Sequence, residues 1–102
     1  MDWKPEEDIV CCEVCVYEYV IKKNGTDINS CIDKIKQHAS IWQRDSGSIR
    51  NRIQNIKAEL EKLRVDNTLP IAPRERAAVQ TKKVLMTCLK NAGYLKSSEE
   101  IV

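Results

Sequence analysis

Apolar side chains recur every three or four residues along most of the chain, and this spacing predicts amphipathic helices. The first predicted helix runs from about Pro5 to Lys22, with the proline and an acidic run in its first turn, beside the positive end of the helix dipole. It has two apolar stripes, one of Ile9, Cys12, Val16, Tyr19 and Val20 and the other of Val10, Val14, Tyr17 and Ile21. We therefore expect neighbouring helices to cover it on two sides.

Two further helices are predicted in the middle of the chain. The apolar stripe of the second, from about Asp27 to Ala39 with Thr26 or Asp27 as its N-cap, contains Ile28, Cys31, Ile32, Ile35 and Ala39. The third begins at Ser46, capped by Ser46 or Asp45, and extends to Val65. Its apolar residues step by four and three and so share one face: Ile49, Ile53, Ile56, Leu60 and Leu63. A seam shorter than three heptads favours core packing over a coiled coil.

A fourth helix is predicted from about Pro73 to Ala92, after a break at residues 67–73 that contains two of the three prolines. Gly93 ends this helix, and residues 96–102 are expected to form a frayed tail. We expect its apolar side to cover the second stripe of the first helix. Its basic side can be a phosphate-contacting surface, a dimer edge or plain solvent exposure, and contains Arg74, Arg76, Lys82, Lys83 and Lys90.

Composition favours an all-α fold. The 102 residues include three glycines, three prolines and no phenylalanine, so long stretches contain no helix breaker. A chain of this length forms one modest core and does not enclose a deep cleft between two lobes. It has a single histidine and no pair of carboxylates spaced for metal-assisted catalysis, so we expect a binding protein without a cofactor and not an enzyme.

Charge is distributed unevenly, although the net formal charge is only +2. Residues 1–20 are strongly acidic, whereas residues 44–57 and 72–96 contain an excess of lysine and arginine. A molecule with one basic side can approach a polyanion such as nucleic acid. Ordinary solvated helix faces produce the same pattern, so charge alone does not decide between the two interpretations.

The cysteines and the chain's start bear on location. No apolar run is long enough to span a bilayer and the acidic start is unlike a signal peptide, so we expect a cytoplasmic protein, or a nuclear one in a eukaryote. Thiols stay reduced there, and five cysteines do not make a closed disulfide framework.

The chain has the residue types of a zinc site in Cys11, Cys12 and Cys15, together with Cys31 and His38. Because zinc thiolates usually lie on a knuckle or loop and not inside a helix, we expect buried thiols and no metal.

The outward side of the third helix has the most distinctive chemistry. If Ile49 and Ile53 point inward, then Arg50, Asn51 and Gln54 point outward. These side chains pair with guanine and adenine edges in the DNA major groove. The residues suited to contact the flanking phosphates are Ser46 and Ser48 at the helix start, together with Arg44, Arg52 and Lys57. Glutamate and lysine replace these residue types in later turns, which indicates that the first half of the helix meets the partner.

Two segments resemble known DNA-binding domains. Residues 3–8, WKPEED, resemble the W-T-x-E-E-D start of a Myb/SANT repeat, and residues 47–56, GSIRNRIQNI, resemble the third helix of that family. The same arrangement is similar to the small DNA-binding domains that precede HNH nuclease domains in bacterial and phage proteins. The resemblance covers roughly residues 3–60. It implies a tri-helical helix-turn-helix fold and places Arg50, Asn51 and Gln54 at base-reading positions.

We therefore expect a helix-turn-helix unit at residues 1–66, extended by a C-terminal helix at residues 67–102 that packs on the first helix. The expected function is double-stranded DNA binding by the helix at 46–65, in a regulator or a detached specificity module, with a homodimer or a second module adding specificity. The alternative is a protein-binding adaptor, as SANT domains often are, or a phage-type inhibitor of a host defence complex that targets nucleic acids. DNA binding should weaken steeply with salt, whereas an apolar protein interface should not.

Overall fold

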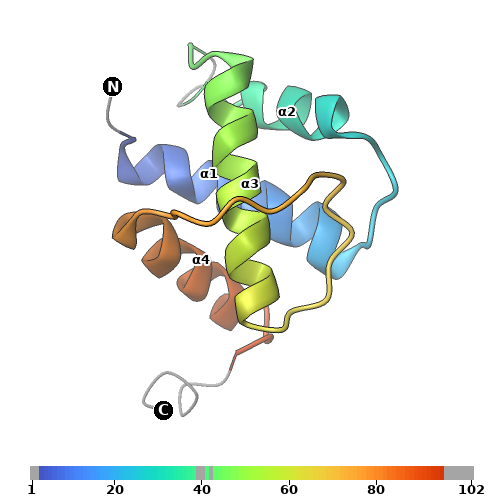
Figure 1. Ribbon diagram of the computed structural model, residues 1–102. Coiled ribbons are helices and arrows are strands. Elements are labelled where there is room, and N and C mark those ends of the chain that lie inside the picture. The colour runs from blue at the N-terminus through green and yellow to red at the C-terminus, as the bar shows by residue number, and fades with distance from the viewer. Residues whose placement is uncertain (1–2, 39–40, 42, 96–102) are drawn as a thin grey trace.

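The computed structural model describes residues 3–38, 41 and 43–95, and every regular element in them is helical (Figure 1). The elements are α1 (Pro5–Cys15), a π-helix η1 (Val16–Ile21), α2 (Ile28–Lys36), α3 (Ser46–Lys62) and α4 (Val79–Asn91). The described residues contain no β-strand, so the predicted all-α fold is confirmed. None of these helices is both long and apolar enough to cross a membrane. The second helix ends at Lys36, before the predicted Ala39, because residues 37 and 38 are not helical. Ala39 itself and the predicted frayed tail at 96–102 lie outside the described residues.

The first helix starts at Pro5 as predicted, but its geometry changes halfway along. At its start, the carboxylate of Glu7 accepts a hydrogen bond from the backbone N–H of Lys4 at 2.8 Å. After Cys15 the helix widens into η1, where the N–H of Lys22 donates to the carbonyl of Tyr17 at 3.0 Å. The apolar spacing predicts a single regular α-helix because it does not distinguish an α-turn from a π-turn.

The caps of α2 and α3 are acidic side chains. Asp27 accepts a hydrogen bond from the N–H of Ser30 at 2.8 Å, which satisfies a donor that the helix leaves unpaired. The C-terminal end of α3 is set by Arg64, whose φ of 57° is left-handed, and the N–H of Val65 turns back to the carbonyl of Leu60 at 2.9 Å. This closing motif ends α3 at Lys62, one turn before the predicted end.

The core contains aliphatic side chains and thiols from all five helical elements. Ile49, Ile53 and Ile56 of α3 are fully buried, which confirms the inward face predicted for this helix. The fully buried hydrophobic residues on the other elements are Cys11, Cys12, Cys15, Tyr19, Val20, Cys31, Ile35, Leu85 and Leu89. Burial raises the pKa of the Cys11 and Cys12 thiols, so both stay neutral and pack as small apolar groups. The predicted burial of the thiols is confirmed for Cys11, Cys12, Cys15 and Cys31, and Cys88 is half-buried.

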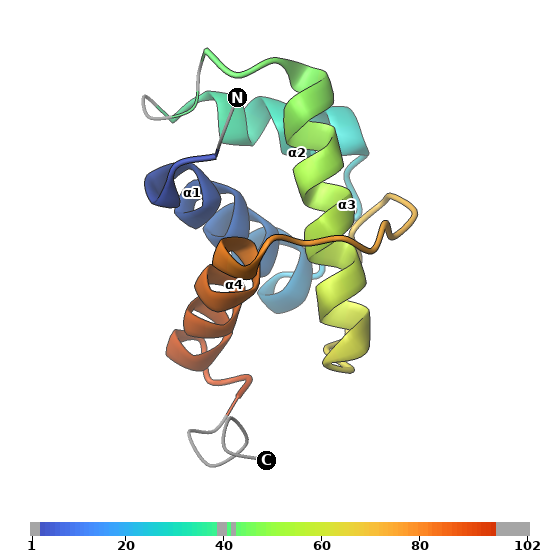
Figure 2. The same ribbon diagram turned by 60° about the vertical axis from the view of Figure 1, so that its left-hand side comes forward.

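A long connection, residues 63–78, joins α3 to α4 by crossing the outward side of α3 (Figures 1 and 2). We call it the strap. The prediction that the fourth helix begins at Pro73 is wrong, because residues 73–78 are not helical. The N–H of Arg74 donates to the carbonyl of Gln54 on α3 at 3.1 Å, and Arg76 has a φ of 122°. These contacts and this backbone conformation are incompatible with an α-helix, so tertiary packing overrides the local helix preference.

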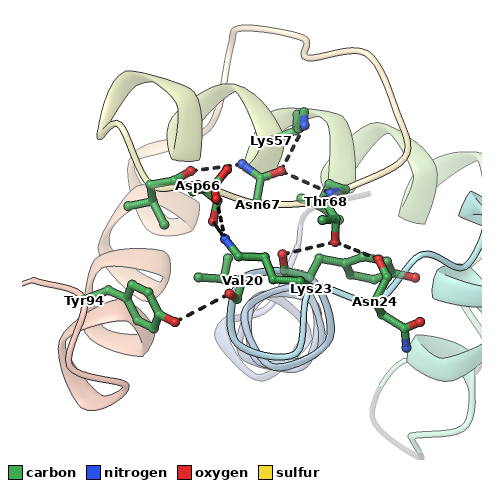
Figure 3. Close-up of polar contacts among 11 residues, drawn as sticks. Val20, Lys23, Asn24, Lys57, Asp66, Asn67, Thr68 and Tyr94 are labelled. Atoms are coloured by element: carbon green, nitrogen blue, oxygen red, sulfur yellow. Dashed lines mark hydrogen bonds and ion pairs between the residues drawn. The ribbon is translucent and has the colours of Figure 1, made fainter.

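The first half of the strap is fixed to the end of η1 (Figure 3). The N–H of Thr68 donates to the carbonyl of Tyr19 at 2.9 Å, and its hydroxyl donates to the carbonyl of Asn24 at 2.7 Å. Lys23 forms an ion pair with Asp66 at 2.8 Å. The strap is therefore held in place before it turns towards α3.

α4 packs along α1 and ends at Asn91, one residue before the predicted Ala92 (Figure 2). Gly93 terminates it, as predicted. Gly93 has a φ of 84°, and the next N–H, that of Tyr94, turns back to the carbonyl of Leu89 at 2.8 Å. The second stripe of the first helix, which the sequence predicts to lie under α4, is not covered at its C-terminal end. Tyr17 and Ile21 are 54% and 44% exposed.

A buried carboxylate, Asp8, connects α1 with α3 and α4. Its Oδ1 lies 3.3 Å from Nε of Arg52 on α3. The same oxygen accepts a hydrogen bond from the hydroxyl of Thr81 at 3.2 Å, and Oδ2 accepts one from the amide of Gln80 at 2.6 Å. Thr81 in turn accepts a hydrogen bond from Arg52. Because an unpaired charge is costly to bury, these contacts determine how the three helices pack.

We predict that Asp8→Ala lowers the free energy of unfolding by about 3–5 kcal/mol, because the guanidinium of Arg52 would stay buried without a counter-charge. Urea unfolding followed by circular dichroism measures the change. Asp33→Ala, which removes an exposed carboxylate on α2, is the control and should change stability by less than about 0.5 kcal/mol. Equally small losses in the two variants would contradict the role given to Asp8.

Candidate nucleic-acid interface

The first two turns of α3 present the side chains that the sequence assigns to DNA bases. Arg50 and Asn51 are exposed there, on the side opposite the buried Ile49 and Ile53. Arg50 forms no ion pair in the part of the chain that the structure describes. Its guanidinium is therefore available to a ligand, beside the carboxamide of Asn51.

The strap engages the next turn of α3. Gln54, the third residue assigned to bases, is half-buried and donates from its amide to the carbonyl of Ala72 at 3.3 Å. Asn55 donates to the carbonyl of Arg74 at 2.8 Å, and the guanidinium of Arg74 donates to the side-chain oxygen of Asn51 at 3.4 Å. The surface left free for a partner is thus shorter than the sequence predicts, since it ends where the strap crosses.

The N-terminal end of α3 already has an anionic cap. The carboxylate of Asp45 accepts a hydrogen bond from the backbone N–H of Ser48 at 2.7 Å. The hydroxyl of Ser46 accepts one from the ammonium of Lys36 at 3.3 Å. This end therefore offers hydroxyls and a lysine to a phosphate, but not the N–H of Ser48, which already has a partner.

Lys57, another residue assigned to phosphates, faces the strap. Its ammonium donates to the side-chain oxygen of Asn67 at 2.9 Å (Figure 3). It also lies beyond the turn where the strap crosses α3 at Gln54. The structure therefore keeps the outward residues of the first two turns together and separates Lys57 from them.

The structure corrects the placement of Arg44 and Arg52, which the sequence assigns to flanking phosphates. They are only 7% and 8% exposed. Arg44 donates to both carboxylate oxygens of Glu7, each at 2.9 Å, while Arg52 pairs with Asp8. The indole ring of Trp3 lies against both guanidinium groups, at 4.2 Å from Arg44 and 4.3 Å from Arg52. The two arginines stabilise the fold, and neither lies where it can contact a phosphate.

The sequence contains a signal for this buried cluster. Asp8 falls on the same helical face as Cys11, Cys12 and Cys15, and that face is buried. A carboxylate within an apolar stripe needs a cationic or hydrogen-bonding partner elsewhere in the chain. An acidic residue in a first turn is equally explained by the helix dipole, so the sequence alone does not separate the two roles.

Two strap arginines, Arg74 and Arg76, extend the basic surface. Both are exposed and lie on non-helical chain, in place of the fourth helix predicted for them. Lys82 and Lys83 follow as exposed residues in the first turns of α4. The basic side predicted for one helix is therefore divided between the strap and α4.

The residue types of a zinc site do not gather at one place. In residues 3–38, 41 and 43–95, no three histidine, cysteine, aspartate or glutamate side chains are arranged to bind a metal ion. Cys11, Cys12, Cys15 and Cys31 lie in the core, and His38 is exposed just after α2.

Comparisons with models of known families, with curated proteins and with solved structures give no match. The Myb/SANT resemblance therefore remains a prediction from the two motifs. The helix-turn-helix assignment and the contact residues remain predictions as well.

We predict that Glu7→Gln weakens the acid dependence of stability. Hydrogen bonds from Arg44 lower the pKa of the Glu7 carboxyl from its ordinary value of 4.5. A carboxyl with a lower pKa in the folded chain contributes stability above the unfolded value, and this stability is lost as the pH falls through the folded pKa. Below pH 4.5, the free energy of unfolding should therefore fall less steeply in Glu7→Gln than in the unaltered protein.

A pH series of urea unfolding measures the two slopes. Glu6→Gln is the matched control, because Glu6 is an exposed neighbour outside the Arg44 pair, and it should keep the slope of the unaltered protein. The same slope in Glu7→Gln and the unaltered protein would refute the linkage to Arg44.

Proposed function

We propose that this chain binds double-stranded DNA through the first two turns of α3, with Arg50 and Asn51 at base edges in the major groove. The observation that supports this best is the exposed Arg–Asn pair on a helix whose opposite side is fixed in the core by Ile49 and Ile53. Arginine pairs bidentately with guanine, and asparagine with adenine. Because the helix backbone is anchored, the two side chains meet a partner from a defined direction.

The free part of α3 is long enough to carry the proposed contacts. From Ser46 to Gln54, where the strap crosses, the helix is about 12 Å long at a rise of 1.5 Å per residue. The major groove is about 12 Å wide and admits an α-helix. Recognition helices lie in this groove and contact base edges with residues of their first turns, which is where Arg50 and Asn51 lie on α3.

The proposed contacts differ from those that the sequence predicts. Arg44 and Arg52 are left out because they are buried, and Lys57 because it faces the strap. Gln54 joins the base contacts only if its 3.3 Å hydrogen bond to the strap opens. The proposed phosphate contacts on this part of the molecule are Lys36, Ser46 and Ser48.

Two base-reading residues imply that the chain does not act alone. Each good bidentate contact provides about 1–3 kcal/mol of discrimination, so two provide about 2–6 kcal/mol. Specific and non-specific binding typically differ by about 4–10 kcal/mol. We therefore propose that a second copy or a second DNA-binding module completes recognition, in a regulator or a detached specificity module.

We predict that Arg50→Ala combined with Asn51→Ala abolishes the preference for a selected duplex over random duplex, because both base contacts are lost. Selection of bound sequences from a random pool, followed by gel shift, measures the preference. Circular dichroism should show unchanged helicity, since both residues are exposed and α3 is held in the core by Ile49 and Ile53.

Arg64→Ala combined with Asn29→Ala is the matched control. It removes the same two residue types from exposed positions outside the first turns of α3. This control should retain the preference. If the Arg50/Asn51 variant retains selective and random binding at the level of the unaltered protein, the assignment to α3 is wrong.

A protein-binding adaptor is the second candidate function, and one observation favours it. Ile9, Tyr17 and Ile21 are 41%, 54% and 44% exposed, at spacings that are multiples of four along α1 and η1, with the exposed Glu13 between Ile9 and Tyr17. Exposed apolar side chains suit a protein partner, including the defence complex considered above. Binding through this surface should survive physiological salt, whereas binding through phosphates should weaken steeply.

A further inference from the structure

The strap lies across α3 at the boundary between the free turns and the rest of the molecule (Figures 1 and 2). Contacts with α3 fix it there: the backbone N–H of Arg74 reaches the carbonyl of Gln54 at 3.1 Å, and the amide of Asn55 reaches the carbonyl of Arg74 at 2.8 Å. Its first half is held by Thr68 and Asp66 at the end of η1 (Figure 3). The strap is thus positioned by contacts at both of its halves.

Arg74 and Arg76 are the two cations in the second half of the strap, where it crosses α3; its first half contains Arg64. Both are exposed, and neither forms an ion pair with any described residue. Glu75, which lies between them in the sequence, is not their partner either. The guanidinium of Arg74 lies 3.4 Å from the side-chain oxygen of Asn51, so it borders the proposed base-reading pair directly. Five other cations of the described residues form ion pairs, namely Lys23, Lys34, Arg44, Arg52 and Lys62.

The backbone at Arg76 is strained. Its φ of 122° lies in a region that side chains with a Cβ rarely adopt. Such residues persist when their surroundings impose the conformation, and they concentrate at functional sites. Here the chain is fixed on both sides of Arg76: Arg74 is hydrogen-bonded to α3 before it, and α4 begins at Val79 after it. The strained residue is an exposed arginine.

We propose that the strap is a second DNA-binding element, in which Arg74 and Arg76 contact backbone phosphates at the rim of the groove that α3 enters. This inference rests on the proposed function of α3. It assigns to the strap the flanking role that the buried Arg44 and Arg52 do not perform. Because phosphates recur along every duplex, these contacts add affinity without sequence preference.

The test is the double variant Arg74→Gln with Arg76→Gln, titrated against random-sequence duplex by fluorescence anisotropy over a range of salt concentrations. Each phosphate contact contributes about 0.9 to the slope of log affinity against log salt, so the slope should fall by about 1.8. Between 50 and 200 mM salt, the affinity of the unaltered protein should drop about 12-fold more than that of the variant. The selected duplex should lose affinity by the same factor as random duplex.

Two further variants make the result specific. Arg64→Gln with Lys22→Gln removes the same charge from an exposed residue at the start of the strap, ten residues before Arg74, and from one directly after η1. This control should leave the slope nearly unchanged, because the proposal assigns phosphate contacts only to the arginines where the strap crosses α3. Arg74→Lys with Arg76→Lys keeps both charges and should keep the slope of the unaltered protein. Unfolding midpoints identify any variant that is not folded. If the double glutamine variant is not folded, the salt slopes of Arg74→Gln alone and Arg76→Gln alone are compared with that of the lysine variant.

The outcomes separate this inference from the function on which it rests. If the Arg74/Arg76 variant keeps the slope of the unaltered protein, or changes no more than the control, the strap does not contact phosphates. The role of α3 would still stand in that case if the Arg50→Ala, Asn51→Ala variant, and no other, loses the preference for the selected duplex. Affinity lost on the selected duplex alone would indicate base contacts and overturn the phosphate assignment. If the unaltered protein binds no duplex at low salt, both proposals fail.

Discussion

The packing of the helices depends on one buried ion pair, between Asp8 on α1 and Arg52 on α3. Thr81 of α4 accepts from the arginine and donates to the carboxylate, so the same pair also positions α4. Trp3 lies against the guanidinium and helps to exclude water. Any rotation of α3 that separates the pair leaves two uncompensated charges in the core, which is strongly disfavoured. The direction in which the outward side of α3 faces follows from this constraint.

The strap then decides how much of that outward side is free. By bonding to the carbonyl of Gln54 and the amide of Asn55, it removes the middle of α3 from contact with a partner. It leaves an N-terminal stretch of helix with an exposed Arg–Asn pair and a pair of exposed arginines beside it. In the proposed complex, this stretch of helix contacts base edges and the two arginines contact the phosphates that border the groove.

The sequence predicts the helical class, the buried face of α3 and its outward pair, because these follow from a spacing of three and four residues and are confirmed by the burial of Ile49 and Ile53. It does not predict the late start of α4 or the strap, since those depend on backbone contacts between distant segments. The burial of Arg52 was missed for a related reason. A lone arginine on a helix looks like a surface cation until its partner, Asp8, is recognised within a buried stripe.

Titration of isotope-labelled protein with duplex DNA, followed through the side-chain signals of arginine, tests most directly whether exposed and buried arginines have separate roles. On addition of DNA, the signals of Arg50, Arg74 and Arg76 should shift, while those of Arg44 and Arg52 should remain in place. Unchanged signals of Arg50, Arg74 and Arg76, or shifts confined to the two buried arginines, would contradict this division.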